Sequence, residues 1–285
     1  MAATIAALGT IVLGATVRAT GAGDACGDDW PICNGRIVPE FDAKVLTEYA
    51  HRLATPVLIG LIGGLAYVAW RRYRGVRRVV IPAAAAFGLL FVQAALGALV
   101  VRRGLSPVLV TAHLATAMLL VGSLVLATAA SWTLAAPRLA RDGLVRAAWA
   151  GAGTILLVIV VGAYVRGEGA GLAFADWPLM GGRVIPDLSS EPRVSQFAHR
   201  LVALLAVPVF AWIAARAWRV RAERPAAAAF AAAALAALLA QVLIGALNVW
   251  TRLATGARIA HVALASLAWA AVVAAATLAR SGRTA

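Results

Sequence analysis

Charged residues are scarce in this chain. Asp, Glu, Lys and Arg make up 13% of its 285 residues, whereas they make up about 25% of a typical soluble domain. Apolar residues reach 62%, which is more than the core of a soluble protein of this length could bury. The shortage of charge therefore excludes a soluble globular protein and indicates a membrane protein.

Acidic residues are also few. The chain has 12 Asp and Glu residues, and they form no acidic motif that could hold a metal-bound diphosphate. A membrane prenyltransferase would need such a motif, so this class of enzyme is not favoured. The 26 basic residues give a net charge of +14, which would suit a nucleic-acid partner only if they formed a binding face.

Eight apolar runs predict eight transmembrane helices. They cover about residues 2–17, 45–70, 79–101, 108–133, 144–165, 194–218, 225–250 and 256–279. Most reach the roughly 20 residues that a helix needs to cross a bilayer. The runs are rich in Ala, Leu and Val without the alternation of a barrel strand. We therefore expect an all-α integral membrane protein in contact with membrane lipid.

The first run, 2–17, is short, and no basic residue precedes it. A cleaved signal peptide is the alternative interpretation of such a run. We expect a transmembrane helix, because the run has a counterpart later in the chain. A start codon placed slightly too late would also explain its shortness.

The arginines indicate the orientation. Fourteen of them follow the second, fourth and sixth runs or lie in the C-terminal tail: Arg71, Arg72, Arg74, Arg77, Arg78, Arg138, Arg141, Arg146, Arg216, Arg219, Arg221, Arg224, Arg280 and Arg283. That side carries two acids, Asp142 and Glu223, and the other side carries the remaining 12 basic and 10 acidic residues. By the positive-inside rule the first side is cytoplasmic. Both termini are then inside, loops 18–44 and 166–193 are outside, and no nucleic-acid partner is expected.

Short segments recur 147 or 148 residues apart. The matched segments are 14–18 with 162–166, 29–31 with 176–178, 35–39 with 182–186, 50–53 with 198–201, 97–99 with 245–247, and the glutamines Gln93 with Gln241. The repeat predicts two four-helix halves, 1–140 and 141–285. Each half has an even number of spans, so both have the same orientation, as in a parallel repeat. We expect two pseudo-symmetric four-helix bundles, each able to build a cofactor site between facing helices.

The chain has only four histidines, one on each even-numbered run: His51, His113, His199 and His261. His51 and His113 lie at similar depth near the outer end, and so do His199 and His261. Ionisable residues inside a membrane are costly and usually functional. Two imidazoles at one depth suit the axial ligation of a haem iron, whereas zinc would more often need further ligands. A lone histidine here would more often be a polar group at the headgroup boundary, but four at matched positions favour haem.

Haem carries two propionates, and arginine is the best partner for a carboxylate. Arg52 and Arg200 directly follow two of the histidines, and Arg18 and Arg166 lie at the same outer boundary. These four are candidate propionate partners, and Arg102, Arg103, Arg252 and Arg258 share the boundary. The alternative for each is a side chain that extends to the membrane interface.

Two features occur in the first half only. Glu48 lies three residues before His51 on the same helix face, and its counterpart is Gln196. A carboxylate near a haem edge could accept a proton or stabilise a cation; the alternative is a glutamate solvated at the helix start. Cys26 and Cys33 lie in an outside loop, where an oxidising compartment favours a disulfide. Their spacing leaves open whether the bond is structural or redox-active, and no C-x-x-C-H motif for covalent haem is present.

The loop sequence CGDDWPICNG at 26–35, followed by EYAHR at 48–52, resembles the cysteine-containing type of haem A synthase. The resemblance covers nearly the whole chain. It implies an oxidoreductase that converts the C8 methyl group of haem O to a formyl group by two successive hydroxylations and loss of water. It also implies roles for five residues: haem b on His199 and His261, substrate haem O near His51 and His113, and catalysis by Glu48.

The resemblance further implies a bacterial cell membrane as the location and an aa3-type terminal oxidase as the destination of the product. Haem O synthase and oxidase assembly factors are candidate partners. A non-enzymatic dihaem b-type electron carrier would also explain the histidines, but not why Glu48 and the cysteines occur in one half. A transporter would explain a parallel repeat, but its polar sites would be expected at mid-membrane. The deeper Gln93 and Gln241 are more often interhelical hydrogen-bonding residues.

Overall fold

The computed structural model describes residues 1–27, 32–140 and 142–282. Eight long helices make up most of this part: α1 (Ala2–Thr20), α2 (Ala43–Tyr73), α3 (Arg77–Arg102), α4 (Pro107–Trp132), α5 (Gly143–Gly167), α6 (Glu191–Arg219), α7 (Pro225–Trp250) and α8 (Thr255–Leu278). A short 3-10 helix, η1 (Ala170–Leu172), follows α5. All eight long helices are long and apolar enough to cross a membrane, which confirms the all-α class with eight spans. Residues 29–31 of the repeated loop motif, Arg141 and Arg283 lie outside the described residues.

Polar and proline residues set the helix starts. The Asp42 carboxylate accepts hydrogen bonds from the backbone N–H groups of Lys44 and Val45 and caps α2. Asp142 caps α5 in the same way, through the N–H of Val145. Proline stands in the first turn of α4, α6 and α7, where its missing N–H costs no helical hydrogen bond. These starts lie up to three residues before the apolar runs, because the capping turn is itself polar.

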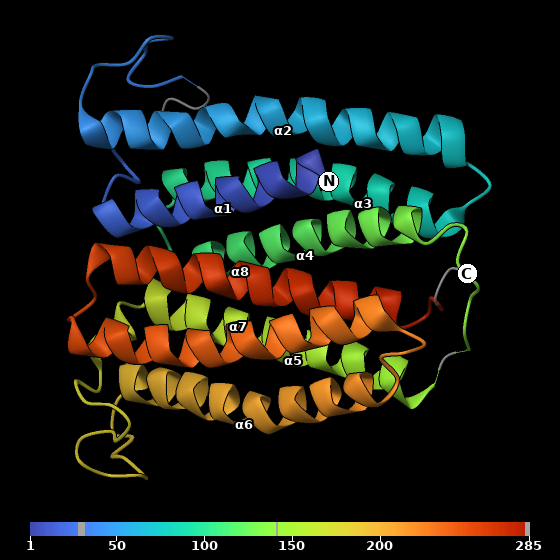
Figure 1. The fold of residues 1–285 in the computed structure, drawn as a ribbon. Helices are drawn as coiled ribbons and strands as arrows, with labels where there is room; N and C mark the ends of the chain where they lie inside the picture. Colours follow the sequence, from blue (N-terminus) through green and yellow to red (C-terminus); the bar gives the residue numbers. More distant parts are fainter. Residues whose placement is uncertain (28–31, 141, 283–285) are drawn as a thin grey trace.

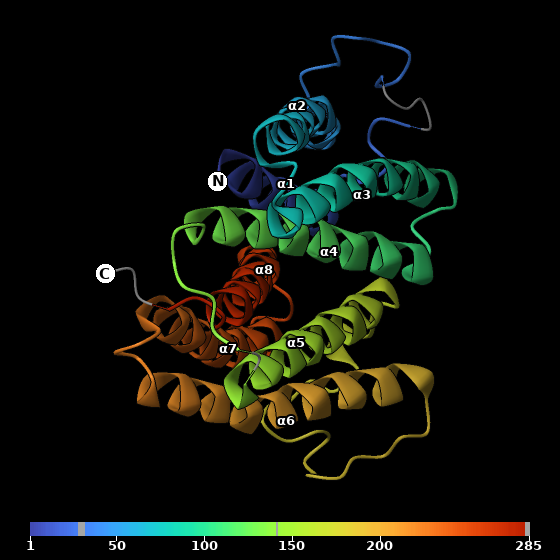
Figure 2. The same cartoon turned by 90° about the vertical axis from the view of Figure 1, so that its right-hand side faces the viewer.

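The helices run roughly side by side, with α1–α4 above α5–α8 in both views (Figures 1 and 2). The two groups contact each other through α1 and α4 on one side and α5 and α8 on the other. We call this boundary the seam. The described parts of the two long connections, residues 21–27, 32–42 and 168–190, lie at one end of the bundle, together with the short α3–α4 and α7–α8 turns (Figure 1). This end is called the loop end below.

A buried tryptophan joins the two halves at the seam. Trp269 of α8 donates a hydrogen bond from Nε1 to the Met118 carbonyl of α4, at 2.6 Å. Its ring lies so close to Gly122 that a Cβ there would be 2.9 Å from Cζ2. The outer helix faces instead expose large apolar side chains, such as Leu204 at 67% and Leu243 at 64%. Such faces suit contact with lipid. The pseudo-symmetry of the halves and the cytoplasmic side of the termini stay predictions.

Candidate functional site

The four histidines lie in the loop-end part of the even-numbered helices, half-buried in each case. The rings of His199 on α6 and His261 on α8 lie next to each other in an edge-to-face arrangement, with centroids 6.5 Å apart and planes at 72°. His51 on α2 and His113 on α4 are also close enough to interact electrostatically. Nδ1 of all four is buried and has no hydrogen-bond partner among the described residues. The structure therefore brings together the two pairs that the sequence predicts.

The spacing of the second pair fits a metal ion between two imidazoles. Two metal–nitrogen bonds of about 2 Å and two ring radii of about 1 Å give a centroid separation of about 6 Å, and the observed value is 6.5 Å. No group of three or more His, Cys, Asp or Glu side chains that could hold a metal occurs in residues 1–27, 32–140 and 142–282. Two neutral imidazoles per site are the donor set of an axially ligated haem, and the residues present fit that group.

Two glutamines connect neighbouring helices beside the histidines. Gln93 of α3 places Nε2 3.1 Å from Nε2 of His113, whereas Gln241 of α7 donates from Nε2 to the backbone carbonyl of His261 at 2.8 Å. Both are interhelical hydrogen bonds, as predicted. They differ in target, because Gln93 engages the ring nitrogen that would bind a metal and Gln241 engages the backbone. The two histidine sites are therefore not equivalent.

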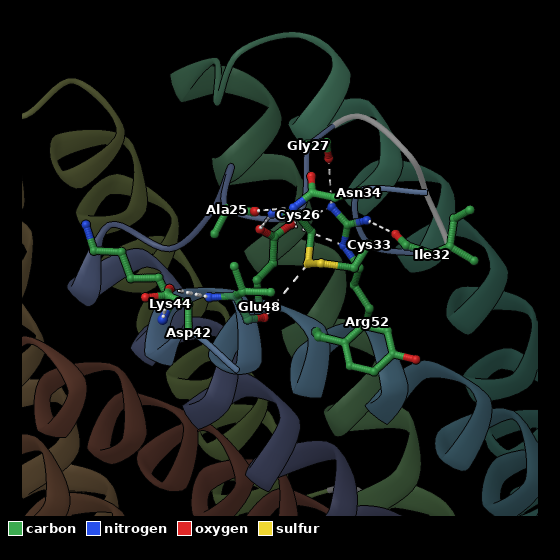
Figure 3. Close-up of a disulfide and its surroundings, with 12 residues drawn as sticks. Ala25, Cys26, Gly27, Ile32, Cys33, Asn34, Asp42, Lys44, Glu48 and Arg52 are labelled. Atoms are coloured by element: carbon green, nitrogen blue, oxygen red, sulfur yellow. Dashed lines mark hydrogen bonds and ion pairs between the residues drawn. A yellow bond between two sulfur atoms is a disulfide. The ribbon is translucent and has the colours of Figure 1, made fainter. Parts of the chain in front are cut away.

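Glu48 lies in a buried ion pair beneath the first long loop (Figure 3). It is 3% exposed, so the alternative of a solvated glutamate at the helix start is wrong. Oε1 accepts from Nε and Nη2 of Arg52 at 3.1 and 2.5 Å, and Oε2 accepts from the backbone N–H of Cys26 at 2.8 Å. Arg52 also donates to the carbonyls of Ile32 and Gly27, at 2.6 and 3.0 Å. Glu48 and Arg52 together fasten the loop to α2.

The second half fastens its loop with the equivalent positions. Gln196 is 4% exposed; its Oε1 accepts from the Phe174 N–H and its Nε2 donates to the Gly171 carbonyl, both at 2.6 Å. Arg200 donates to the carbonyls of Asp176 and Leu179, each at 3.0 Å. The residues three before and one after each α2 or α6 histidine thus hold the loop. The sequence repeat contained this signal, since Glu48 and Gln196 are both polar at matched positions.

Cys26 and Cys33 form a disulfide, as predicted, and both are fully buried. The bond lies beside Glu48 and Arg52 (Figure 3). The matching positions of the second half are the buried Phe174 and Met180. The first loop is therefore closed covalently, whereas the second has two buried apolar side chains at these positions. The backbone N–H of the first position donates to the polar side chain of the histidine helix in both loops.

Three arginines gather at the loop end of the seam. Arg258 of α8 donates from Nη2 to the Ala19 carbonyl of α1 at 2.6 Å, so it reaches across from one half to the other. Arg166 of α5 interacts electrostatically with both Arg258 and Arg18 of α1. Nε of Arg18 and of Arg258 is buried and has no hydrogen-bond partner in the described part of the chain. The sequence did not indicate that Arg258 lies with Arg18 and Arg166, because only the packing of α1 against α8 brings it to the other two.

One loop carboxylate outside the spans is strongly bound. Asp176 accepts hydrogen bonds from the backbone N–H groups of Gly181 and Gly182, at 2.7 and 2.8 Å. These bonds, that of Gly182 first, hold the pKa of Asp176 below its ordinary value. Asp176 belongs to the repeated Asp-Trp-Pro motif, so the motif shapes the loop turn in the second half.

Residues 1–273 match the family described as cytochrome oxidase assembly protein. The chain belongs to the haem A synthase family. It is 33% identical over 271 residues to a heme A synthase of Geobacillus kaustophilus, covering 91% of this chain and 84% of the relative. It is 32% identical over 259 residues to a heme A synthase of Symbiobacterium thermophilum, covering 87% and 83%. A heme A synthase of Halalkalibacterium halodurans is 30% identical over 229 residues, covering 76% and 75%.

These matches confirm the haem A synthase family that the loop and histidine motifs predict. The match to the family spans both long loops and all four histidines.

Proposed function

We propose that the protein is a haem A synthase that oxidises the C8 methyl group of haem O to a formyl group. Two successive hydroxylations of the methyl carbon followed by loss of water give the aldehyde of haem A, which a terminal oxidase then uses. Membership of the family supports the proposal, and so do the relatives that bear this name. The observation in this chain that carries it is the adjacent pair His199 and His261, together with a second pair that differs from it chemically.

His199 and His261 would hold haem b as a permanent cofactor, because their ring spacing suits an iron between them. When bound, haem b supplies one-electron redox chemistry to the site. His51 and His113 would bind the substrate haem O. The Gln93 amide gives the His113 ring nitrogen a partner when no metal is bound, which suits an occupant that arrives and leaves. Gln241 leaves the His261 ring to the metal, which suits a resident group.

Glu48 would be the catalytic carboxylate. Arg52 and the Cys26 N–H both donate to it, and these contacts fix the position of its carboxylate group. A fixed negative charge near the substrate edge can stabilise positive charge that develops at the methyl carbon, or accept the proton that leaves. The neutral Gln196 occupies the matching position in the other half, where no chemistry is proposed.

The haem propionates would bind at the loop end of the seam. Arg18 and Arg166 are favoured there, because they lie in a cluster of three cations with Arg258. Arg52 and Arg200 are less favoured as propionate partners, since both already donate to loop carbonyls. One cation cluster between the two halves could serve a propionate from each haem.

We also propose a bacterial cell membrane as the location, with both termini in the cytoplasm. The arginine-rich connections at the end opposite the long loops support this orientation. Haem O synthase would supply the substrate, and terminal oxidase assembly factors would receive the product. The buried disulfide in the first long loop suits an outside compartment.

Pigment extraction tests the proposed activity. The protein is purified from cells that make haem O, and its haems are separated by chromatography with mass detection. Haem b together with haem A or hydroxylated haem O is the expected result. Haem b alone, with haem O present and unchanged, would favour the dihaem electron carrier instead.

A further inference from the structure

Each of the four histidine rings lies against a glycine on the helix that precedes its own. Gly14 of α1 faces His51, Gly97 of α3 faces His113, Gly162 of α5 faces His199, and Gly245 of α7 faces His261. The glycines recur at the repeat offset, 14 with 162 and 97 with 245. In all four pairs the nearest ring atom is Cε1, the carbon between the two ring nitrogens, so each ring presents this corner to the neighbouring helix.

The distances leave little or no room for a side chain. A Cβ at Gly162 would be 2.6 Å from Cε1 of His199, and one at Gly14 would be 2.9 Å from Cε1 of His51. The corresponding value is 3.2 Å at Gly97, which is tight, and 3.5 Å at Gly245, which is an ordinary contact. Atoms in the first two pairs would have to move, because packed interiors do not absorb such an overlap.

Glycine in a helix interior needs a reason, since it is among the poorest helix formers. Some helical glycines of this chain have no such contact. A Cβ added at Gly9 of α1 or at Gly153 of α5 would have no other atom within 4 Å. The contact with a histidine is therefore a property of particular positions. It also accounts for the repeated Gly-Ala pairs 14–15 and 162–163, which no other contact of the site explains.

The rings need something to fix their direction. A metal-binding histidine is usually oriented by a hydrogen bond from its second nitrogen. Here Nδ1 of all four rings has no such partner among the described residues, although the Val158 carbonyl, one turn before Gly162, lies near enough to interact with His199. Packing against the preceding helix can replace that bond, because a ring held at this corner can turn only away from it.

We propose that Gly14, Gly97 and Gly162 are positioning residues that let each histidine ring lie against the neighbouring helix and so direct its metal-binding nitrogen into the site. Gly245 makes the same contact more loosely. The part of this inference that concerns haem rests on the proposed function. The contact itself concerns only glycine and histidine and can be tested apart from haem.

The test uses Gly162→Ala in the full-length protein, purified in detergent, with Gly153→Ala on the same helix as the matched control. We expect Gly162→Ala to lower the haem b content per protein at least threefold, or to shift the low-spin electron paramagnetic resonance signal of the haem that remains. Gly153→Ala should match the wild type in both. Gly14→Ala and Gly97→Ala should act likewise on the first pair, with Gly245→Ala the mildest of the four.

A double-mutant cycle with His199→Ala separates ring contact from general damage. If the added methyl collides with the ring, Gly162→Ala should lower the melting temperature in the wild-type background and have little effect once His199 is alanine. Additive effects in the cycle, or a Gly162→Ala protein with wild-type haem content and resonance signal, would overturn the inference. If the two substitutions are not additive but no protein of the cycle contains haem b, the contact between Gly162 and His199 is supported and the proposed cofactor is refuted.

Discussion

Replacing Glu48 with alanine removes the carboxylate that neutralises Arg52, whose side chain is 5% exposed. Loss of one partner of a buried ion pair costs about 3–5 kcal/mol, because the other charge loses a partner at a site that water does not reach. Arg52 keeps its bonds to the Gly27 and Ile32 carbonyls, so the lower end applies. The Cys26 N–H also loses its acceptor, which adds about 1 kcal/mol and brings the expected destabilisation to about 4 kcal/mol.

Glu48→Gln is the matched control. An amide oxygen can still accept from Cys26, as Gln196 accepts from Phe174, so we expect a loss of about 1–2 kcal/mol. The two variants are compared by thermal unfolding in detergent and by the rate at which a protease cuts the loop 21–42. The alanine variant should melt lower and be cut faster than the glutamine variant.

The haem A yield of the same two variants separates a structural role of Glu48 from a catalytic one. Glu48→Gln should keep most of its stability and its haem b, and lose most of its yield of haem A. An alanine variant within about 0.5 kcal/mol of the wild type would refute the buried-pair reasoning, since that is the range of an ordinary surface substitution. Normal haem A yield from the glutamine variant would refute the catalytic role.

Three other predictions concern the disulfide, the Asp142 cap of α5 and the cation cluster. Cys33→Ser opens an eight-residue loop closed with Cys26, which should cost about 2.5 kcal/mol and speed its proteolysis without loss of haem b; loss of haem b would contradict the local role. The hydrogen bond from Arg224 holds the pKa of Asp142 below its ordinary value. The stabilisation of the folded state by this pair is therefore present above about pH 4 and is lost as the pH falls through the lower folded pKa. The Asp142 side chain is 41% exposed, so the fall in melting temperature at acid pH should be small. Asp142→Asn should abolish this part of the fall; a variant whose melting temperature depends on pH as in the wild type would contradict the prediction. Arg166→Gln relieves repulsion within the cation cluster, so it should raise the melting temperature of the protein without haem. The same variant, purified from cells that make haem, should contain less haem than the wild type; an unchanged haem content would argue against propionate binding there.

The fold was predictable because the membrane reduces it to a problem of length and polarity. Eight apolar runs become eight helices, since unsatisfied backbone groups are too costly in lipid for irregular structure. The helix ends were less predictable. α6 begins at Glu191, three residues before the apolar run at 194, because a proline in the first turn starts the helix within polar sequence.

The site was predictable where few residues of a type occur. The chain has four histidines and two cysteines, so the pairings had few alternatives. The partners of Arg52 and Arg200 were not predictable, because they depend on the path of loops that have no periodicity. The place of Arg258 depends on how α1 packs against α8, and sequence spacing alone does not determine that packing.

The division of labour between the two histidine pairs is tested most directly by removing one pair at a time. The variants are His51→Ala with His113→Ala, and His199→Ala with His261→Ala, each purified from cells that make haem O. We expect the first variant to keep haem b and to lack haem O and haem A, and the second to lack haem b and to make no haem A. Loss of haem b from the first variant and its retention in the second would contradict the proposed roles of the two pairs.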